Sequence, residues 1–439
     1  MRARSTHLIA ISLTLCWLPS AAAQISIHDL PKVARARAER LRPKQVAALE
    51  PFWADLSLDY EDNQEFLDRR IVEAAQLGDS VVPMLLEKLR PLQSSAAAKN
   101  LASNCRRVLQ RLDPGSFIEA LAELARGDNS TARQEAIRLL GFAADPQAIS
   151  LLSGLLDKAE AWSRTHIIRS LERLQAKSAA PKVVNLLGAG DRNLRQDVLS
   201  YLATAKADQV SPTVVQALSA ETDERLLPNY IDYFAACVRR DEAATEALLL
   251  LLNESRIDWQ DTLRLVQGLA EIAPLRHEPT ARALNELIDK NQTSSLAVNA
   301  AVSLRALGDN SGVTRLKRSL DERLRRQKKA ATLYEQRARL LFAIAEFGDA
   351  AEDYEKIIDY AEGAAMTRRA YYGLLKSEAR RNKNQSSKIQ SIVKHMKSSG
   401  MSPAEFERLA SQDEPFREAL EHDRSQAFLK QLRKSRAPK

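Results

Sequence analysis

The sequence is poor in the residues on which β-proteins and disulfide-stabilised domains depend. It has only 14 glycines, 16 prolines and 3 cysteines in 439 residues, and aromatic residues make up 5% of it. The shortage of glycine argues against the turn-rich sheets of β-architectures. The shortage of aromatics means that leucine, isoleucine, valine and alanine must build the interior. One core rarely grows past roughly 250 to 300 residues, so we expect stacked helices in place of a single globular core.

The chain also lacks the short motifs of common enzymes. It contains no G-x-S-x-G, G-x-x-x-x-G-K, G-x-G-x-x-G or H-E-x-x-H sequence. His277 and Glu278 are followed by Pro279, which prevents a metal-binding helix face there. Ser391 and Lys394 form an S-x-x-K without its companion motifs. We therefore expect a non-enzymatic protein with no catalytic residue, no metal and no cofactor.

The N-terminus has the features of a secretory signal peptide. Arg2 and Arg4 precede an apolar run at residues 8–18, and a group of alanines ends at Ala23. The run is shorter than the ~20 residues that span a bilayer. The sequence thus predicts a signal peptide at 1–23, cleaved near Ala23, and a periplasmic or secreted bacterial protein. No later apolar run is long enough for a membrane helix, so we expect no integral membrane segment after cleavage.

Charges of both signs are mixed along the chain. The formal net charge of +8 falls to +6 when Arg2 and Arg4 leave with the signal peptide, and 57 acidic residues are interleaved with 65 basic ones. This pattern is typical of an evenly charged surface and not of a polyanion-binding one. Together with the export signal, it leads us to expect no nucleic-acid partner.

A two-helix unit occurs three times between residues 128 and 223. Arg133, Arg164 and Arg195 follow one another at intervals of 31 residues, each in an apolar helical segment. A second apolar segment comes after each of them, in the order ISLLSGLLD, PKVVNLL and PTVVQALS. Asp145 and Ser211 each stand before a proline, so both are predicted to cap the start of a second helix.

Such a unit cannot bury its apolar faces alone and must stack on its neighbours. Looser copies can be drawn before and after the central three, and the five leucines at 248–252 should face neighbours around the whole helix. We therefore predict an all-α fold, a right-handed α-solenoid of stacked antiparallel helix pairs. Cys105 and Cys237 lie several repeats apart, so we expect two buried thiols and no disulfide.

The three central copies resemble HEAT-type repeats of the short bacterial kind, on the recurring arginines and on Pro146, Pro181 and Pro212 in the second helices. Their 31-residue period is shorter than the usual unit of about 40 to 47 residues. The chain from Leu333 onward is similar to tetratricopeptide (TPR) helices, on Gly348-Asp349 and Tyr354, although the signature tryptophan of that family is missing. These resemblances imply protein–protein scaffolding and no reaction.

The sequence predicts four regions. They are a signal peptide at 1–23, an N-terminal linker with capping helices at 24–59, a HEAT-like α-solenoid at 60–320 and a TPR-like helical region at 321–439. Around Asp321 the sequence becomes rich in arginine and lysine, which indicates one long helix or two abutting helices at the change of domain.

The second helices of the units are predicted to line a concave face that holds an extended protein partner. The exposed positions expected on this face grow more charged toward the C-terminus; they are Lys182, Asn185, Gln216, Glu246, Arg282, Glu286, Arg315 and Lys317. Arg282, Glu286, Arg315 and Lys317 are therefore the predicted binding residues of a monomeric scaffold. Two alternatives stay open: a module that binds the envelope surface or a polyanion, and an enzyme with converging polar residues in a solenoid cleft.

Overall fold

The computed structural model of the protein describes residues 49–78, 81–89, 95–254, 256–381, 391–392 and 395. All regular structure in these ranges is helical, which confirms the predicted all-α fold class. The predicted signal peptide and its cleavage near Ala23 lie outside the described residues, as do most of the linker at 24–59 and most of the chain beyond residue 381. Those predictions stay predictions.

The chain divides into two compact units, the first ending at Cys237 and the second beginning at Val238. The predicted change of domain near Asp321 falls inside the second unit. There α17 (Ser311–Arg326) ends and α18 (Ala331–Ala343) begins after a short break, so two separate helices are present at this point.

The first unit is a succession of short helices that pack in chain order. A helix at 49–56 comes first. The helices that follow are α2 (Gln64–Ala75), α3 (Val82–Lys88), α4 (Ala96–Arg111), α5 (Ile118–Arg126), α6 (Ser130–Leu140), α7 (Pro146–Leu156), α8 (Ala161–Arg173), α9 (Ala180–Val183), α10 (Arg192–Thr204), α11 (Ser211–Ser219) and α12 (Leu227–Cys237).

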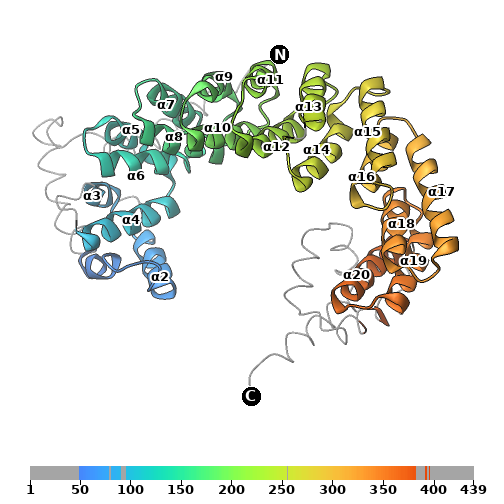
Figure 1. The fold of residues 1–439 in the computed structure, drawn as a ribbon. Coiled ribbons are helices and arrows are strands. Elements are labelled where there is room, and N and C mark those ends of the chain that lie inside the picture. Colours follow the sequence, from blue (N-terminus) through green and yellow to red (C-terminus); the bar gives the residue numbers. More distant parts are fainter. Residues whose placement is uncertain are drawn as a thin grey trace, which may run out of the picture. The chain divides into compact units, whose positions relative to one another are not determined.

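Within this unit the helices form two layers (Figure 1). The first helices of the repeats, α6, α8, α10 and α12, lie side by side in one layer, and α5, α7, α9 and α11 make the other. The 31-residue spacing holds in the core, where Leu152, Val183 and Val214 are all fully buried in successive second helices. The apolar faces therefore cover one another from unit to unit, as expected of helical repeats.

The ends of the first helices repeat as well. Gln175 closes α8 with a positive φ of 49°, and the carbonyl oxygen of the next residue, Ala176, accepts a hydrogen bond from the Tyr201 hydroxyl at 2.6 Å. One repeat later the Ala207 carbonyl oxygen accepts from the Tyr233 hydroxyl at 2.9 Å. In these two copies a buried tyrosine therefore donates to a carbonyl oxygen just beyond the first helix of the preceding repeat.

The two predicted proline-associated caps have different outcomes. Asp145 caps α7, with its carboxylate accepting from the Gln147 N–H at 2.7 Å. The prediction for Ser211 is wrong: Ser211 is already the first residue of α11, Val210 is the N-cap, and the Ser211 side chain makes no cap. A 3₁₀ turn at Asp208–Val210 leads straight into the helix, so Ser211 has helical angles.

The two cysteines do not pair with each other. Cys105 is buried, and burial raises the pKa of its thiol to about 12. Cys237 is half-buried, and its thiol donates to the Leu202 carbonyl oxygen at 3.4 Å. The expectation of two buried thiols therefore holds fully for Cys105 and in part for Cys237.

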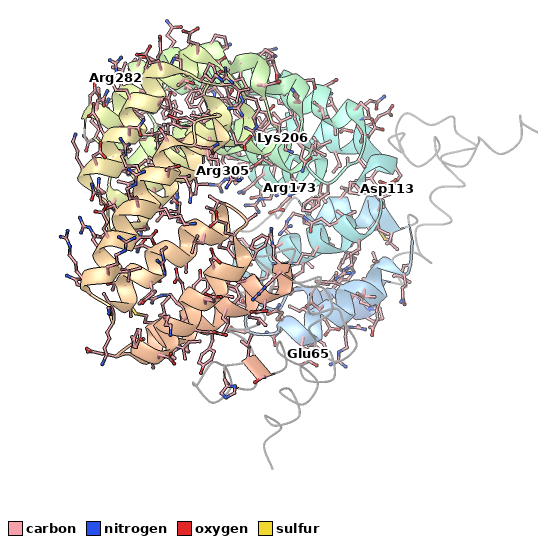
Figure 2. The ribbon with its side chains drawn as sticks, turned by 90° about the vertical axis from the view of Figure 1, so that its right-hand side faces the viewer. Glu65, Asp113, Arg173, Lys206, Arg282 and Arg305 are labelled. Carbon is pink, nitrogen blue, oxygen red and sulfur yellow. The ribbon has the colours of Figure 1, made fainter. Side chains whose placement is uncertain are left out.

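The second unit continues the pattern with longer helices. They are α13 (Glu242–Glu254), α14 (Trp259–Ile272), α15 (Glu278–Lys290), α16 (Ser295–Ala306), α17, α18, α19 (Phe347–Tyr360) and α20 (Ala364–Arg381). Arg305 of α16 donates to the Ile344 carbonyl oxygen at the end of α18 at 3.0 Å (Figure 2). The five-leucine run lies in α13, but Leu250 is 58% exposed, so the prediction that the run is covered on all sides is wrong at that position.

A buried ion cluster joins three helices of the second unit. The guanidinium of Arg337 on α18 donates to both carboxylate oxygens of Asp353 on α19, at 2.8 and 2.7 Å, and to Asp321 on α17 at 2.5 Å. The Asp353 side chain is 4% exposed. Arg337 and Asp321 are partly exposed, so the costly loss in this cluster is that of the buried Asp353 carboxylate, which accepts two charge-assisted hydrogen bonds.

We predict that Asp353→Asn lowers the free energy of unfolding by about 2 kcal/mol, because the buried side chain loses its charge-assisted hydrogen bonds while Arg337 keeps Asp321 as its ion partner. Scanning calorimetry of the full chain measures the change. Glu278→Gln is the matched control, since its ion pair with Arg282 has side chains 70% and 83% exposed. That variant should lose less than about 1 kcal/mol. Equal losses in the two variants would contradict a structural role for the Arg337 cluster.

Candidate docking groove

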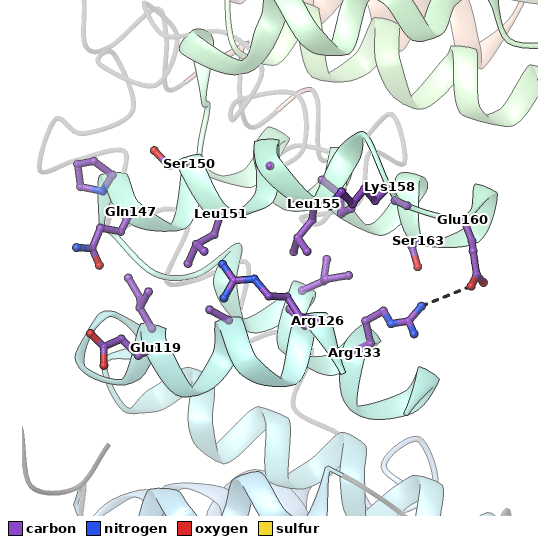
Figure 3. A pocket seen from close by; sticks show the side chains of 18 residues that line it. Glu119, Arg126, Arg133, Gln147, Ser150, Leu151, Leu155, Lys158, Glu160 and Ser163 are labelled. Carbon is purple, nitrogen blue, oxygen red and sulfur yellow. Dashed lines mark ion pairs between the residues drawn. The ribbon is translucent and has the colours of Figure 1, made fainter. Parts of the chain in front are cut away.

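A groove of about 1170 Å³ lies between α5 and α7 in the first unit. Residues of α6 and α8 complete its walls (Figure 3). Its apolar lining consists mainly of Ile118, Ala122, Ala125, Ile137, Leu151 and Leu155. Apolar walls with polar groups at the rim are typical of sites that bind ligands or peptide segments.

Gly154 keeps the groove open along α7. It lines the groove, and a Cβ atom added there would meet no other atom within 4 Å. A glycine inside a helix is destabilising by roughly 0.5–1 kcal/mol relative to alanine. The glycine therefore weakens the helix slightly and leaves the space in front of it empty of side chain.

The groove lies on the second-helix face that the sequence predicted for binding. The buried residues Leu152, Val183 and Val214 set the register between copies, so Gly154 is equivalent to Asn185 and Gln216. Both of those positions are exposed and polar, as predicted. The groove could not be predicted by looking for charged residues on this face. In the first copy the equivalent positions hold the apolar Leu151 and Gly154.

Charges are distributed unevenly along the groove (Figure 3). Glu119 lies at one end, Arg133, Lys158 and Glu160 lie toward the other, and the Arg126 guanidinium reaches the middle of the groove. That second end is formed by the last turns of α5 and α7, by α6 and by the start of α8. We call it the polar end of the groove; it carries two cations and one carboxylate.

Arg133 at the polar end is one of the three recurring arginines. Its Nε donates to the Gly127 carbonyl oxygen at 3.1 Å, and its Nη1 lies 3.7 Å from an oxygen of Glu160, whose side chain is 66% exposed. The equivalent Arg195 donates to both oxygens of Glu221, at 2.8 and 2.7 Å, and that carboxylate is 1% exposed. The same arginine position therefore has a tight buried partner in one copy and a distant, solvated one in the other.

The predicted binding residues lie on α15 and α17 of the second unit. Arg282 is exposed on α15 (Figure 2) and pairs with Glu278, and Glu286 pairs with Lys290 on the same helix. Arg315 of α17 contacts Asn285 and Asp289 of α15, while Lys317 lies 2.6 Å from Glu346. Among the described residues no ion pair or hydrogen bond joins two of the four predicted positions. Their role in binding stays a prediction.

A further acidic residue is buried in the first unit, outside the groove. Glu135 on α6 is 5% exposed and pairs with Arg106 of α4 at 2.6 Å and with Arg138 at 3.0 Å. Burial raises the pKa of Glu135, while the two arginines act in the opposite direction. Because Glu135 ties α4 to α6 and does not line the groove, we assign it a structural role.

In the described ranges no three histidine, cysteine or acidic side chains are grouped closely enough to hold a metal ion. None of the helices described is long and apolar enough to cross a membrane.

The fold defines the protein as an all-α, repeat-like chain. The chain matches no family model and no curated protein. Among solved structures it is similar to an engineered protein from the Northeast Structural Genomics Consortium, with 16% identity and a TM-score of 0.36 over 82% of this chain and 98% of that one. A similarity of this size carries no argument about function.

We predict that Glu221→Gln and Glu160→Gln differ sharply in their effect on stability. Glu221 accepts hydrogen bonds from Arg195 and from the Thr222 and Asp223 N–H groups, so its neutralisation should lower the free energy of unfolding by about 3 kcal/mol. Glu160→Gln, at an exposed pair, should cost less than about 1 kcal/mol. Thermal unfolding of both variants measures the difference; similar costs would show that Arg133 depends on Glu160 as Arg195 depends on Glu221.

Proposed function

We propose that the protein is a non-enzymatic scaffold that holds an apolar segment of a protein partner in the groove between α5 and α7. The observation that supports this most directly is the apolar lining next to Gly154, bordered by charged side chains. Small-molecule pockets usually measure about 300–1,000 Å³, and this groove is larger.

The length of the groove suits a peptide segment. It follows α7, whose 11 residues span roughly 16 Å at ~1.5 Å per residue. That length accommodates about three turns of a helix or about five residues of extended chain. A segment of either form can place apolar side chains on Leu151 and Leu155 while its backbone stays near the rim.

Several finer features of the scaffold belong to the same proposal. We infer that the repeats are HEAT-like, that their pairs are antiparallel, and that they build a right-handed solenoid followed by TPR-like helices. The recurring 31-residue core positions support the repeat assignment. The features of residues 1–23 support export to the periplasm or the medium.

The polyanion alternative is less well supported by the contacts of the second unit. Arg282 pairs with Glu278, Arg315 lies beside Asp289, and Lys317 lies beside Glu346. Phosphate binding needs cations that are not already compensated by neighbouring carboxylates. These side chains suit a contact with a mixed-charge protein surface better than a nucleic acid or an anionic polymer.

Gly154→Phe tests the docking proposal, because the ring fills the groove at a position where the structure leaves room for it. We expect the thermal stability to stay unchanged or to rise slightly, since phenylalanine has a higher helix propensity than glycine. Peptides selected from a random displayed library on the purified chain should bind the variant at least about tenfold more weakly, a loss of ~1.4 kcal/mol. Fluorescence anisotropy with labelled peptides measures the affinities.

Gln216→Phe is the matched control, because Gln216 is the equivalent exposed position on α11. It adds the same ring to the same face two repeats later and should leave peptide affinity unchanged. The proposal fails if the selected peptides bind Gly154→Phe as well as the parent chain, or if selection recovers no peptide that binds in solution.

A triple variant tests the binding surface predicted from the sequence. Arg282→Ala, Arg315→Ala and Lys317→Ala together should leave the melting temperature nearly unchanged, because exposed ion pairs contribute at most about 1 kcal/mol each. If α15 and α17 also contact the partner, the affinity of the intact partner should fall while that of the groove peptides stays constant. A lower melting temperature with unchanged partner binding would reject this second contact surface.

A further inference from the structure

The start of α8, at the polar end of the groove, lacks a feature that three other first helices have. Asn129, Asp191 and Asp258 cap α6, α10 and α14, with side-chain oxygens 2.9, 2.8 and 2.9 Å from backbone nitrogens of the first turn. Glu160 stands at the same position of α8 and makes no cap; its carboxylate accepts from the Trp162 indole N–H at 2.6 Å. The first N–H groups of this 13-residue helix therefore have no side-chain acceptor.

A buried hydroxyl lies beside these N–H groups. Ser163 lines the groove and is 2% exposed, and its Oγ has no hydrogen-bond partner among the described residues. Figure 3 places it at the same end as Arg133 and Lys158. Buried hydroxyls in proteins normally have a partner. An acceptor atom of a ligand in the groove is well placed to supply it.

The equivalent site two repeats later shows which kind of chemical group such donors bind. Glu221 stands two residues before the N-cap Asp223, and its carboxylate accepts from Arg195 and from the Thr222 N–H at 3.0 Å. The residue two positions before Glu160 is Lys158. The polar end of the groove therefore has the same arginine position, Arg133, and the same helix start. The position of the Glu221 carboxylate is taken by Lys158, a cation.

We propose that the polar end of the groove binds a side-chain carboxylate of the docked segment, received by Arg133, the Ser163 hydroxyl and the first N–H groups of α8. This inference rests on the docking function proposed above and names the class of partner. The partner segment is amphipathic and acidic: its apolar side chains lie on Leu151 and Leu155, and its aspartate or glutamate side chains face α8.

The charges favour acidic side chains over a free C-terminus as the source of the carboxylate. Arg133 and Lys158 at this end and Arg126 in the middle of the groove oppose Glu160 alone, so these groups have two more cations than carboxylates. A C-terminus supplies one negative charge, whereas a segment with two or more acidic side chains matches the excess. Glu119 at the opposite end repels a second acidic cluster and so sets the direction of the segment.

The test compares two random peptide libraries selected on the purified chain, one with the peptide flanked on both sides by carrier sequence and one with a free C-terminus. We expect both libraries to yield apolar residues at helical or alternating spacing, with aspartate and glutamate enriched on one side of them. In individual peptides, replacing the enriched glutamates with glutamine should weaken binding to the parent chain about tenfold.

Glu160→Asp is the most informative variant. Aspartate at this position can cap α8 as Asp191 caps α10, and the net charge of the chain does not change. We expect this variant to bind the acidic peptides about tenfold more weakly and the glutamine peptides equally well. Ser163→Ala should weaken acidic peptides several-fold without lowering the melting temperature, while Ser153→Ala, on α7 but outside the lining, should have no effect.

Each outcome decides between the proposals. The carboxylate site is overturned, and the docking function stands, if the selected peptides are apolar and depend on Gly154 but show no acidic enrichment. The same conclusion follows if acidic peptides bind the Glu160→Asp variant as well as the parent chain. Enrichment confined to the library with a free C-terminus overturns the assignment to acidic side chains. Peptides that ignore Gly154→Phe overturn the docking function, and the carboxylate site falls with it.

Discussion

The structure depends on the burial of an apolar face that no single helix pair can cover. Leu152, Val183 and Val214 are fully buried at 31-residue intervals. Because each repeat buries its apolar face in the same way, residues at equivalent positions of the repeats can be compared directly. A side chain that departs from its equivalents without a packing reason is then a candidate for function. Gly154, Glu160 and Lys158 are departures of this kind.

The sequence was sufficient for the fold class and for the repeat, because both follow from apolar spacing and from the lack of glycine and aromatics. It was insufficient wherever a detail of the backbone decided the result. Ser211 is inside its helix because a 3₁₀ turn precedes it, and Leu250 is exposed because α13 has an outer side even in a run of leucines. Neither the 3₁₀ turn before α11 nor the exposed side of α13 changes the spacing of apolar residues in the sequence.

The groove illustrates a different limit. Its position on the second-helix face was predictable, but a search for charged residues selected Arg282 and Arg315 of the second unit. An alignment of the copies on their buried residues shows that Gly154 replaces Asn185 and Gln216. That signal was present in the sequence, although its meaning required knowing that the space in front of the glycine is empty. A glycine that leaves space beside a helix is harder to recognise as a functional residue than a charged side chain.

The arrangement at α8 is not forced by the fold. Aspartate, one methylene shorter than glutamate, caps α10 from the equivalent position, and such a cap contributes about 0.5–2 kcal/mol. Next to the groove the chain forgoes this stabilisation, and a buried Ser163 hydroxyl there also lacks a partner among the described residues. A helix start that satisfies its own donors has none to offer a ligand. The loss of local stability is therefore what an acceptor site for a partner's carboxylate requires.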